Sequence, residues 1–277
     1  MANVLVLANQ TIGGQALLDA VRDRAAEGDA RFFVVVPRNK PDHGQVIELE
    51  SVRDAAQVRV DLALAFMREE HIEGSGEVGD PDPYNAAMDA IAEHGIDEII
   101  LSTLPTTSSG WLRRDLPERL EQGSGLPVKH VVTDLGRDGL PFDVCLVVAN
   151  QTAAGDDLIK RLKAKAQEGP RRFIVAVPQG PGDGEAPEAA RVRLRALLDS
   201  LEEAGIVAAG MISHTDPYAA TMNAVQSFLI SEIVISTLPQ NRSEWIKKGL
   251  IEKVRDSTGK PVEHVESTAD DRVEAGA

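Results

Sequence analysis

The sequence predicts two tandem α/β domains, each with a parallel sheet covered by helices on both faces. Three observations predict this fold class. The chain repeats itself, each repeat alternates short apolar runs with amphipathic stretches, and hydrophobic residues make up 43% of the chain although aromatic residues make up only 4%. Cores built from small aliphatic residues are typical of buried parallel strands, and strand-helix alternation favours right-handed crossovers between them.

The repeat covers nearly the whole chain. VLVLANQTIGG begins at Val4, and CLVVANQTAAG begins at Cys145, 141 residues later. The offset falls to 134 where the DPY of Asp82 returns at Asp216, so a seven-residue difference (141 minus 134) lies between Pro37 and Asp82. Solenoid repeats run only ~20–50 residues. The repeat therefore indicates two duplicated domains.

Composition shifts divide the chain into two domains, a linker and a tail. We expect the first domain over 1–135, a linker rich in glycine and proline over 136–141, and the second domain over 142–267. The last residues, 268–277, are small and acidic, and we expect them to be disordered.

The elements of the first copy follow from apolar runs, capping residues and turns. Asp82 before Pro83 predicts a helix start, because the carboxylate can accept from free backbone N–H groups and the proline suits the first turn. We expect a polar loop over 102–110. The predicted strands are 4–8, 32–36, 77–78, 98–101 and 128–132, and the predicted helices are 13–27, 45–70, 83–94 and 111–121.

The central helix of the second copy has the clearer pattern. Its leucines recur at helical spacing, at Leu194, Leu197, Leu198 and Leu201. The charged residues of 191–195 fall on the other side, and we interpret them as a solvated helix face. The fourth strand of this copy is predicted at 233–235.

Charge and cysteine content exclude several classes of function. The chain has 44 acidic and 29 basic residues, a formal charge of −15, which disfavours contact with nucleic acid or anionic lipid. No run approaches the ~20 apolar residues of a membrane span, and the N-terminus lacks the pattern of a signal peptide. The single cysteine, Cys145, falls in a predicted buried strand, which excludes a disulfide or Cys-based metal site. We therefore expect a cytoplasmic protein.

In a doubly wound sheet, ligands bind beyond the carboxyl ends of the strands, where the winding direction reverses. The loops after the first and fourth strands lie there, and the N-terminus of the predicted helix 111–121 could hold an anion. The alternative is that these polar residues only cap helices and form turns. The candidate ligand-binding residues are Asn9, Thr11, Ser102, Thr103 and Arg113 in the first copy, and Asn150, Thr152, Ser236, Thr237 and Lys247 in the second.

Other recurring residues have structural interpretations. We interpret Trp111 and Trp245 as core anchors of the last helices, and His130 and His264 as strand or interface residues without metal ligands at suitable spacing. The chain lacks the phosphate-loop, G-x-G-x-x-G, G-x-S-x-G and H-E-x-x-H motifs, so no residue is an evident catalyst.

The alternation of five strands with helices, the unit of about 135 residues and the G-x-P-V that begins at Gly125 and Gly259 together resemble the universal stress protein family. The resemblance implies a Rossmann-like, adenine nucleotide alpha hydrolase-like sheet of strand order 3-2-1-4-5 in each half. It also implies an internal pseudo-dimer, with 128–132 lying beside 262–265, and allows a further homodimer.

ATP-binding members of that family carry G-x-x-G, nine residues, then G-[ST]. In the first copy these positions hold Ser102, Pro105 and Asp115-Leu116. Proline removes a donor and Asp115 adds negative charge where a triphosphate would lie, so we expect a degenerate motif. In the second copy the positions hold Ser236, Pro239 and Gly249-Leu250.

Three functions remain open at this point. The leading hypothesis is a tandem universal-stress-like protein that binds or regulates without catalysis. The second is a nucleotide-binding stress protein whose modified site lies mainly in the second domain, with Gly249 added to the candidates there and ATP or another adenine nucleotide as the ligand. The third is an enzyme of the wider fold group, whose pyrophosphatase branch carries S-G-G-x-D-S where this chain has NQTIGG from Asn9.

Overall fold

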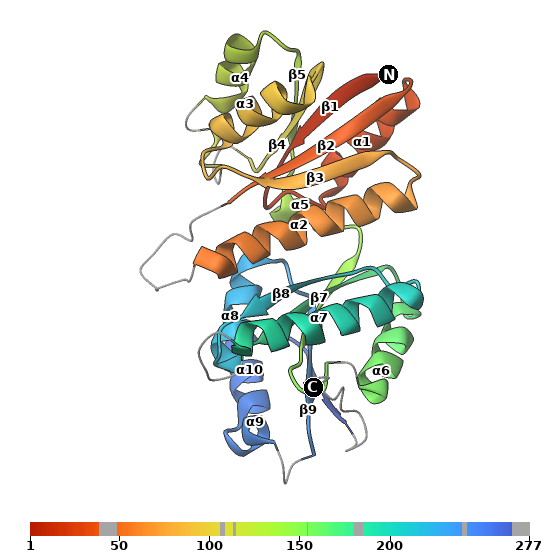
Figure 1. Cartoon of the computed structure of the whole chain (residues 1–277), viewed down its shortest axis with the longest axis vertical. Helices are drawn as coiled ribbons and strands as arrows, with labels where there is room; N and C mark the ends of the chain where they lie inside the picture. The colour runs from red at the N-terminus through yellow and green to blue at the C-terminus, as the bar shows by residue number, and fades with distance from the viewer. Residues whose placement is uncertain are drawn as a thin grey trace. The chain divides into compact units, whose positions relative to one another are not determined.

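The computed structural model describes residues 1–38, 49–105, 109–112, 115–153, 155–179, 185–239 and 243–267. The chain divides into two compact units, Met1–Pro141 and Phe142–Ala277. In each unit strands and helices alternate along the chain (Figure 1).

The first unit holds one parallel sheet of order β3-β2-β1-β4-β5. The predicted fold class and strand order are therefore confirmed here. The elements are β1 (Ala2–Leu7), α1 (Gln15–Ala26), β2 (Ala30–Pro37), α2 (Leu49–Glu69), β3 (Gly74–Gly79), α3 (Pro83–His94), β4 (Glu98–Thr103), α4 (Leu116–Ser124), β5 (Val128–Val132) and α5 (Leu135–Asp138).

The second unit repeats this order as β8-β7-β6-β9-β10, again with every neighbouring pair parallel. The elements are β6 (Asp143–Val148), α6 (Asp156–Ala166), β7 (Arg171–Pro178), α7 (Glu185–Glu203), β8 (Ala208–Ser213), α8 (Pro217–Ser227), β9 (Glu232–Thr237), α9 (Glu244–Lys247), α10 (Leu250–Thr258) and β10 (Val262–Glu266).

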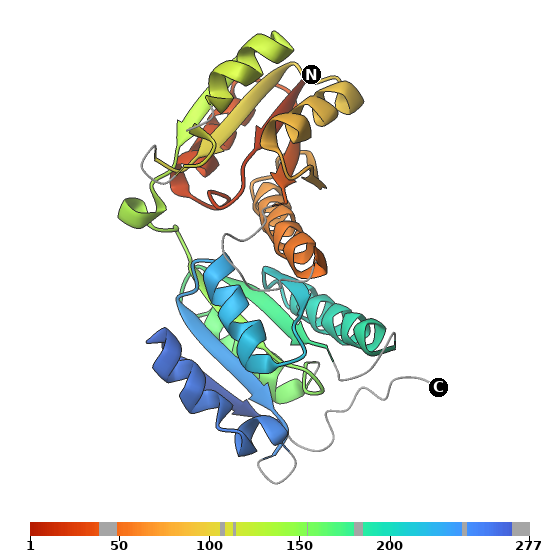
Figure 2. The same ribbon diagram turned by 90° about the vertical axis from the view of Figure 1, so that its left-hand side faces the viewer.

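Helices cover both faces of each sheet, as Figures 1 and 2 show. In the second unit, Leu158 of α6 and Leu197 of α7 pack with Cys145 and Val147 of β6 in one buried cluster. In the first unit, Leu120 of α4 and the alanines of α3 pack on the opposite face. The central strands β1 and β6 are buried from both sides, as their nearly continuous apolar sequences predict.

The predicted helix start at Asp82 is confirmed. Its carboxylate accepts from the backbone N–H groups of Tyr84 at 3.0 Å and Asn85 at 3.2 Å. Asp216, the equivalent residue of the second unit, accepts from the N–H of Ala219 at 2.9 Å. The same cap therefore begins α3 and α8, at the end of each sheet where the strands terminate.

An ion pair recurs at the opposite end of each sheet. Arg24 of α1 contacts Glu98 of β4 at 2.6 Å, and Lys165 of α6 contacts Glu232 of β9 at 2.6 Å. Burial alone would lower the pKa of Lys165, but hydrogen bonds to Glu232 and Glu263 outweigh it and raise that pKa. These pairs hold the first helix of each unit against the fourth strand.

The fourth strands are longer than the sequence predicts. Ser102 and Thr103, expected in a polar loop, are the last residues of β4, where they pair with Val131 and Val132 of β5. Because the fifth strand continues alongside, the parallel ladder continues into the polar residues. The equivalent Ser236 and Thr237 end β9 in the same way.

Helix α4 begins at Leu116, so the predicted start at Trp111 is wrong. Asp115, directly before it, has φ 49°, a left-handed conformation that interrupts a helix. Gly249 occupies the equivalent position with φ 66°, and there it separates α9 from α10. The anion site expected at the N-terminus of a helix that begins at Trp111 is therefore wrong as well.

Two further expectations concern the segments outside the sheets. Part of the expected linker 136–141 is helical, since α5 covers Leu135–Asp138 with Asp134 as its N-cap. The expected disordered tail, 268–277, lies outside the described residues. Within the described part of the chain, no helix has the length and apolar character needed to cross a membrane.

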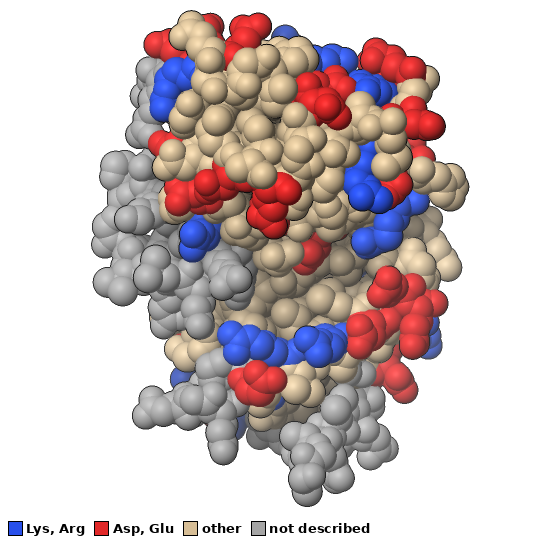
Figure 3. All heavy atoms as spheres, turned by 45° about the horizontal axis from the view of Figure 1, so that its top comes forward, with Lys and Arg blue, Asp and Glu red and all other residues tan. Residues whose placement is uncertain are grey.

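Charged residues of both signs share the surface. On the face that Figure 3 shows, acidic and basic side chains of the described residues lie interspersed.

The central helix of the second unit follows the prediction only in part: Arg191 and Arg195 are exposed, but Arg193 is half-buried, and burial lowers its pKa. The interpretation of 191–195 as a fully solvated face is therefore wrong for Arg193.

We predict that Asp82→Ala lowers the free energy of unfolding of the first unit by about 1 kcal/mol, the usual cost of losing an N-cap. Asp82→Asn retains an acceptor and serves as the control. Urea denaturation followed by the fluorescence of Trp111, in a Trp245→Phe background, reports on this unit alone, because the chain has two tryptophans. Equal stability of the alanine variant and the parent would contradict the prediction.

Candidate functional site

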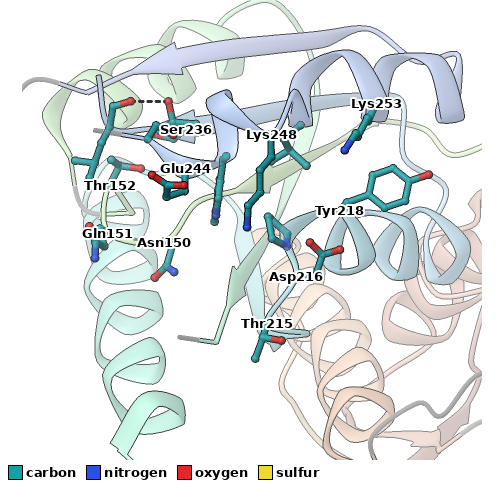
Figure 4. Close-up of a pocket in the computed structure, with 16 residues that line it drawn as sticks. Asn150, Gln151, Thr152, Thr215, Asp216, Tyr218, Ser236, Glu244, Lys248 and Lys253 are labelled. Atoms are coloured by element: carbon teal, nitrogen blue, oxygen red, sulfur yellow. Dashed lines mark hydrogen bonds between the residues drawn. The ribbon is translucent and has the colours of Figure 1, made fainter. Parts of the chain in front are cut away.

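A pocket of about 660 Å³ lies in the second unit, beyond the carboxyl ends of β6 and β9 (Figure 4). These two strands are neighbours, and the winding of the sheet reverses between them. The position is the one where open α/β sheets bind ligands. The pocket is lined by Asn150, Gln151, Thr152, Thr215, Asp216, Pro217, Tyr218, Ser236, Thr237, Leu238, Ser243, Glu244, Trp245, Lys248, Leu250 and Lys253.

Four of the residues expected at this site line the pocket, namely Asn150, Thr152, Ser236 and Thr237. Lys247 and Gly249 are not among the lining residues. Lys247 instead contacts Glu244 one turn earlier at 2.7 Å.

Gly249 has a structural role in the backbone. It is the N-cap of α10, and its N–H donates to the carbonyl of Ile246 at 2.9 Å. Its positive φ of 66° explains why glycine suits this position.

Asp216, Tyr218 and Lys253 line the pocket but were not predicted as ligand-binding residues, whereas Lys248 was expected beside Lys247 at the anion site. Lys248 and Lys253 extend toward the side of the pocket that holds Asp216 and Tyr218, as Figure 4 shows. The repeated DPY of Asp216 was a usable signal, since the helix that it caps begins at the rim of the pocket. Which of two adjacent lysines faces the pocket depends on the turn after α9, and no pattern in the sequence gives it.

Buried polar atoms in the pocket lack hydrogen-bond partners. Thr152 is 2% exposed and Ser236 is 1% exposed, and neither hydroxyl oxygen has a partner in the described structure. The side-chain oxygen of Asn150 is also unpartnered. A buried polar group without a partner costs free energy, so these atoms are suited to a polar ligand that enters the pocket.

The first unit satisfies its equivalent hydroxyls internally. Thr11 donates to the carbonyl of Ser102 at 3.4 Å, and the Ser102 and Thr133 hydroxyls share a hydrogen bond of 3.1 Å. Asn9 donates to the carbonyl of Pro37 at 2.7 Å, although its own side-chain oxygen is unpartnered. In the second unit Ser267 takes the place of Thr133, and its hydroxyl is unpartnered too.

A tyrosine that lies near α4 in the first unit and near α10 in the second has different contacts in the two units. In the first unit the Arg119 guanidinium lies over the ring of Tyr84, 4.6 Å from its centroid. The equivalent residues of the second unit are Lys253 and Tyr218, both of which line the pocket. Tyr218 hydrogen-bonds Ser257 at 2.8 Å.

The charges of the pocket leave two amines available. Asp216 caps α8, and Glu244 pairs with Lys247. The hydrogen bond from Lys247, together with the charges of Lys247 and Lys248, lowers the pKa of Glu244. Lys248 and Lys253 form no ion pair with any residue that the structure describes. An anionic ligand would form ion pairs with both amines.

The recurring histidines lie on the fifth strands, as expected. Thr103 shares a hydrogen bond of 2.9 Å with Nε2 of His130, and Thr237 shares one of 2.8 Å with Nε2 of His264. Burial lowers the pKa of His130, against the opposing charge of Glu118. These pairs join the fourth strand of each sheet to the fifth, which is consistent with a structural role.

The remaining expected residues have separate positions. Trp111 packs against the core of the first unit, as expected, but Trp245 lines the pocket. Arg113 lies outside the described residues. Cys145 is buried in β6, and burial raises the pKa of its thiol, so the reactive thiolate form is disfavoured.

Comparison with known proteins gives structural neighbours only. No protein-family model and no curated protein matches the chain. This chain is similar to universal stress proteins of known structure. The one from Archaeoglobus fulgidus is 15% identical, with 96% of this chain and 97% of that chain covered and a TM-score of 0.37.

Two shorter universal stress proteins match about half of the chain. One, solved in complex with cAMP, is 16% identical, with 48% of this chain and 98% of that chain covered and a TM-score of 0.35. The other, from Burkholderia pseudomallei, is 20% identical, with 46% of this chain and 93% of that chain covered and a TM-score of 0.33. The strand order of the two sheets itself shows the fold.

We predict that the same substitution has a larger effect on stability in the first unit than in the second. Ser102→Ala lowers the free energy of unfolding of the first unit by about 1–2 kcal/mol, because the Thr133 hydroxyl loses its partner. Ser236→Ala changes the stability of the second unit by less than about 0.5 kcal/mol, because no hydrogen bond is lost. Urea denaturation, with Trp111 or Trp245 as the single fluorophore, measures each unit, and equal losses would contradict the prediction.

Proposed function

We propose that the protein is a tandem universal-stress-like binding protein whose second unit holds a small anionic ligand of the adenine nucleotide class without turning it over. The observation that carries the proposal is the pocket, where the buried hydroxyls of Thr152 and Ser236 lack hydrogen-bond partners among the described residues and the amines of Lys248 and Lys253 form no ion pair with those residues. A binding role of this kind accounts for polar atoms that folding alone leaves unsatisfied.

The size and lining of the pocket fit a nucleotide. A volume of about 660 Å³ is in the range of ~300–1,000 Å³ that is common for small-molecule sites. Trp245 and Tyr218 offer flat faces for a base, and the amide of Asn150 offers hydrogen bonds to a base edge. Lys248 and Lys253 provide charge for a phosphate.

The site differs from a cradle of backbone N–H groups for a triphosphate. The N–H of Gly249 donates to Ile246, and the N–H of Ser243 donates to the carbonyl of Pro239 at 3.0 Å. In the first unit the N–H of Ser109 donates to Pro105 at 2.9 Å, and Asp115 adds a negative charge. We therefore propose that the ATP motif is degenerate and that the lysine side chains replace the backbone donors.

The proposal of binding without turnover rests on the surroundings of the hydroxyls. Neither Thr152 nor Ser236 is hydrogen-bonded to a base within the described residues, and an unactivated hydroxyl is a weak nucleophile. Asp216 is held in its capping hydrogen bond. The pocket thus offers groups that bind and orient a ligand rather than groups that transfer its protons.

Two further proposals concern the assembly and the location of the protein. The fifth strands, β5 and β10, are each at the edge of their own sheet, which leaves one side of each strand unpaired within that sheet. We propose that they pair in an internal pseudo-dimer, and that the protein acts in the cytoplasm.

We predict that isothermal titration calorimetry of the full chain with ATP, ADP, AMP and cAMP detects one binding site. Lys248→Ala and Lys253→Ala each weaken the affinity about tenfold, as expected for the loss of a charge-assisted hydrogen bond of about 1.5 kcal/mol. Arg119→Ala is the matched control, since Arg119 occupies the equivalent position to Lys253 but lies over Tyr84 in the first unit.

Two results would contradict the proposed function. The absence of heat and of a thermal shift with all four nucleotides would remove nucleotide binding. Release of inorganic phosphate from ATP at ordinary enzymatic rates, about 1 s⁻¹ or faster, would remove the proposal of binding without turnover.

A further inference from the structure

A second cluster of chemically active side chains lies in the first unit, outside the pocket of the second. Ligand atoms of Glu77, Glu93 and His94 all lie within 4.8 Å of one another. We propose that these three residues bind a divalent transition-metal ion of the zinc class, with a water molecule as a further ligand.

The fold brings the three residues together from two elements. Glu77 lies in β3, and Glu93 and His94 are the last residues of α3, which follows β3 and packs back against the sheet. At the start of this helix Gly79 lies close to Ala86, since a Cβ on Gly79 would come within 2.7 Å of the Ala86 Cβ. The helix therefore ends beside an earlier part of β3, where Glu77 is.

The end of α3 is held firmly. Gly95 ends the helix with φ 60°, and its N–H donates to the carbonyl of Ile91. Asn3 of β1 donates to the carbonyls of His94 at 2.9 Å and Gly95 at 3.1 Å. The last turn, which carries both helical ligands, is thus anchored to the central strand of the sheet.

The His94 ring is oriented toward the carboxylates. It stacks on Phe33, with ring centroids 4.6 Å apart and an interplanar angle of 15°. Its Nε2 lies 4.0 Å from a carboxylate oxygen of Glu77, and its side chain is 25% exposed. A ring that is fixed in place before binding loses little conformational entropy when it takes a metal ion.

The chemistry of the set favours a zinc-class ion. One imidazole with two carboxylates is a nitrogen and oxygen donor set that suits zinc, whereas magnesium and calcium prefer oxygen ligands alone. The two carboxylates neutralise a dication, and the C-terminal end of a helix also favours positive charge. With three protein ligands, one position of a tetrahedral ion remains for water.

The distances require a small adjustment of the glutamates. In a tetrahedral zinc site with bonds of about 2.0–2.1 Å, ligand atoms lie roughly 3.3 Å apart, closer than the 4.8 Å limit found here. The Glu77 side chain is 45% exposed and can rotate toward the fixed imidazole. We expect rotation of the exposed Glu77 and Glu93 side chains to bring the ligand atoms to bonding distance of the ion.

The second unit provides an internal comparison. At the positions equivalent to Glu77, Glu93 and His94 it has Met211, Ser227 and Phe228, none of which is a typical zinc ligand. Its β8 and α8 nevertheless form the same arrangement as β3 and α3. The fold thus does not require two carboxylates and an imidazole here, and their presence in one unit only is consistent with a binding role.

Zinc titration of the tag-free, EDTA-treated full chain tests the site by calorimetry, with Co²⁺ absorption as a second readout of the ligand set. We expect one site in the parent protein. Glu77→Met, Glu93→Ser and His94→Phe introduce the residues that the second unit accepts in the same places. We expect His94→Phe to weaken zinc binding by at least about 100-fold, the upper end of the effect of removing a second-sphere partner.

His71→Asn is the matched control, because His71 is an exposed histidine of the same unit whose φ of 56° asparagine tolerates. It should bind zinc as the parent does. The absence of zinc binding by the parent, or an unchanged isotherm in His94→Phe, would overturn the proposal. No nucleotide is present in this experiment, so its outcome is independent of the pocket in the second unit.

Discussion

The pairing of the first strand of each unit with the fourth is the constraint on which the rest of the structure depends. β1 lies between β2 and β4, and β6 lies between β7 and β9, so the chain winds away from the first strand in both directions. The loops that follow the two neighbouring strands then diverge and leave a crevice at their carboxyl ends. β1 and β6 are buried on both faces, as the central strands of parallel sheets are.

Within this shared frame the two units have diverged in their polar groups. The hydroxyl of Ser102 in the first unit is hydrogen-bonded to Thr133, whereas that of Ser236 in the second has no partner among the residues that the structure describes and lines a pocket. Conversely, the first unit has a Glu77 and His94 pair beside α3 where the second has apolar residues. The two duplicated units thus have cores of the same kind but carry different polar groups.

Local signals were reliable and longer-range ones were not. The cap at Asp82 could be predicted because the carboxylate, the N–H groups and the proline are all within a few residues. The start of α4 could not, because Asp115 adopts a left-handed conformation that is uncommon for residues other than glycine. The sequence offered one signal of this left-handed position, namely Gly249, the residue at the same position in the second copy.

The sequence by itself determined the duplication, the alternation of strands and helices, the capped helix starts and the end of the sheet at which the pocket lies, because period and capping depend on neighbouring residues. Only the tertiary structure decided that Lys248 rather than Lys247 lines the pocket, that Thr152 and Ser236 are left without partners, and that Glu77 meets His94. These outcomes depend on where each crossover connection places the next element and on which polar groups form hydrogen bonds with one another. Contacts between residues far apart in the sequence determine both.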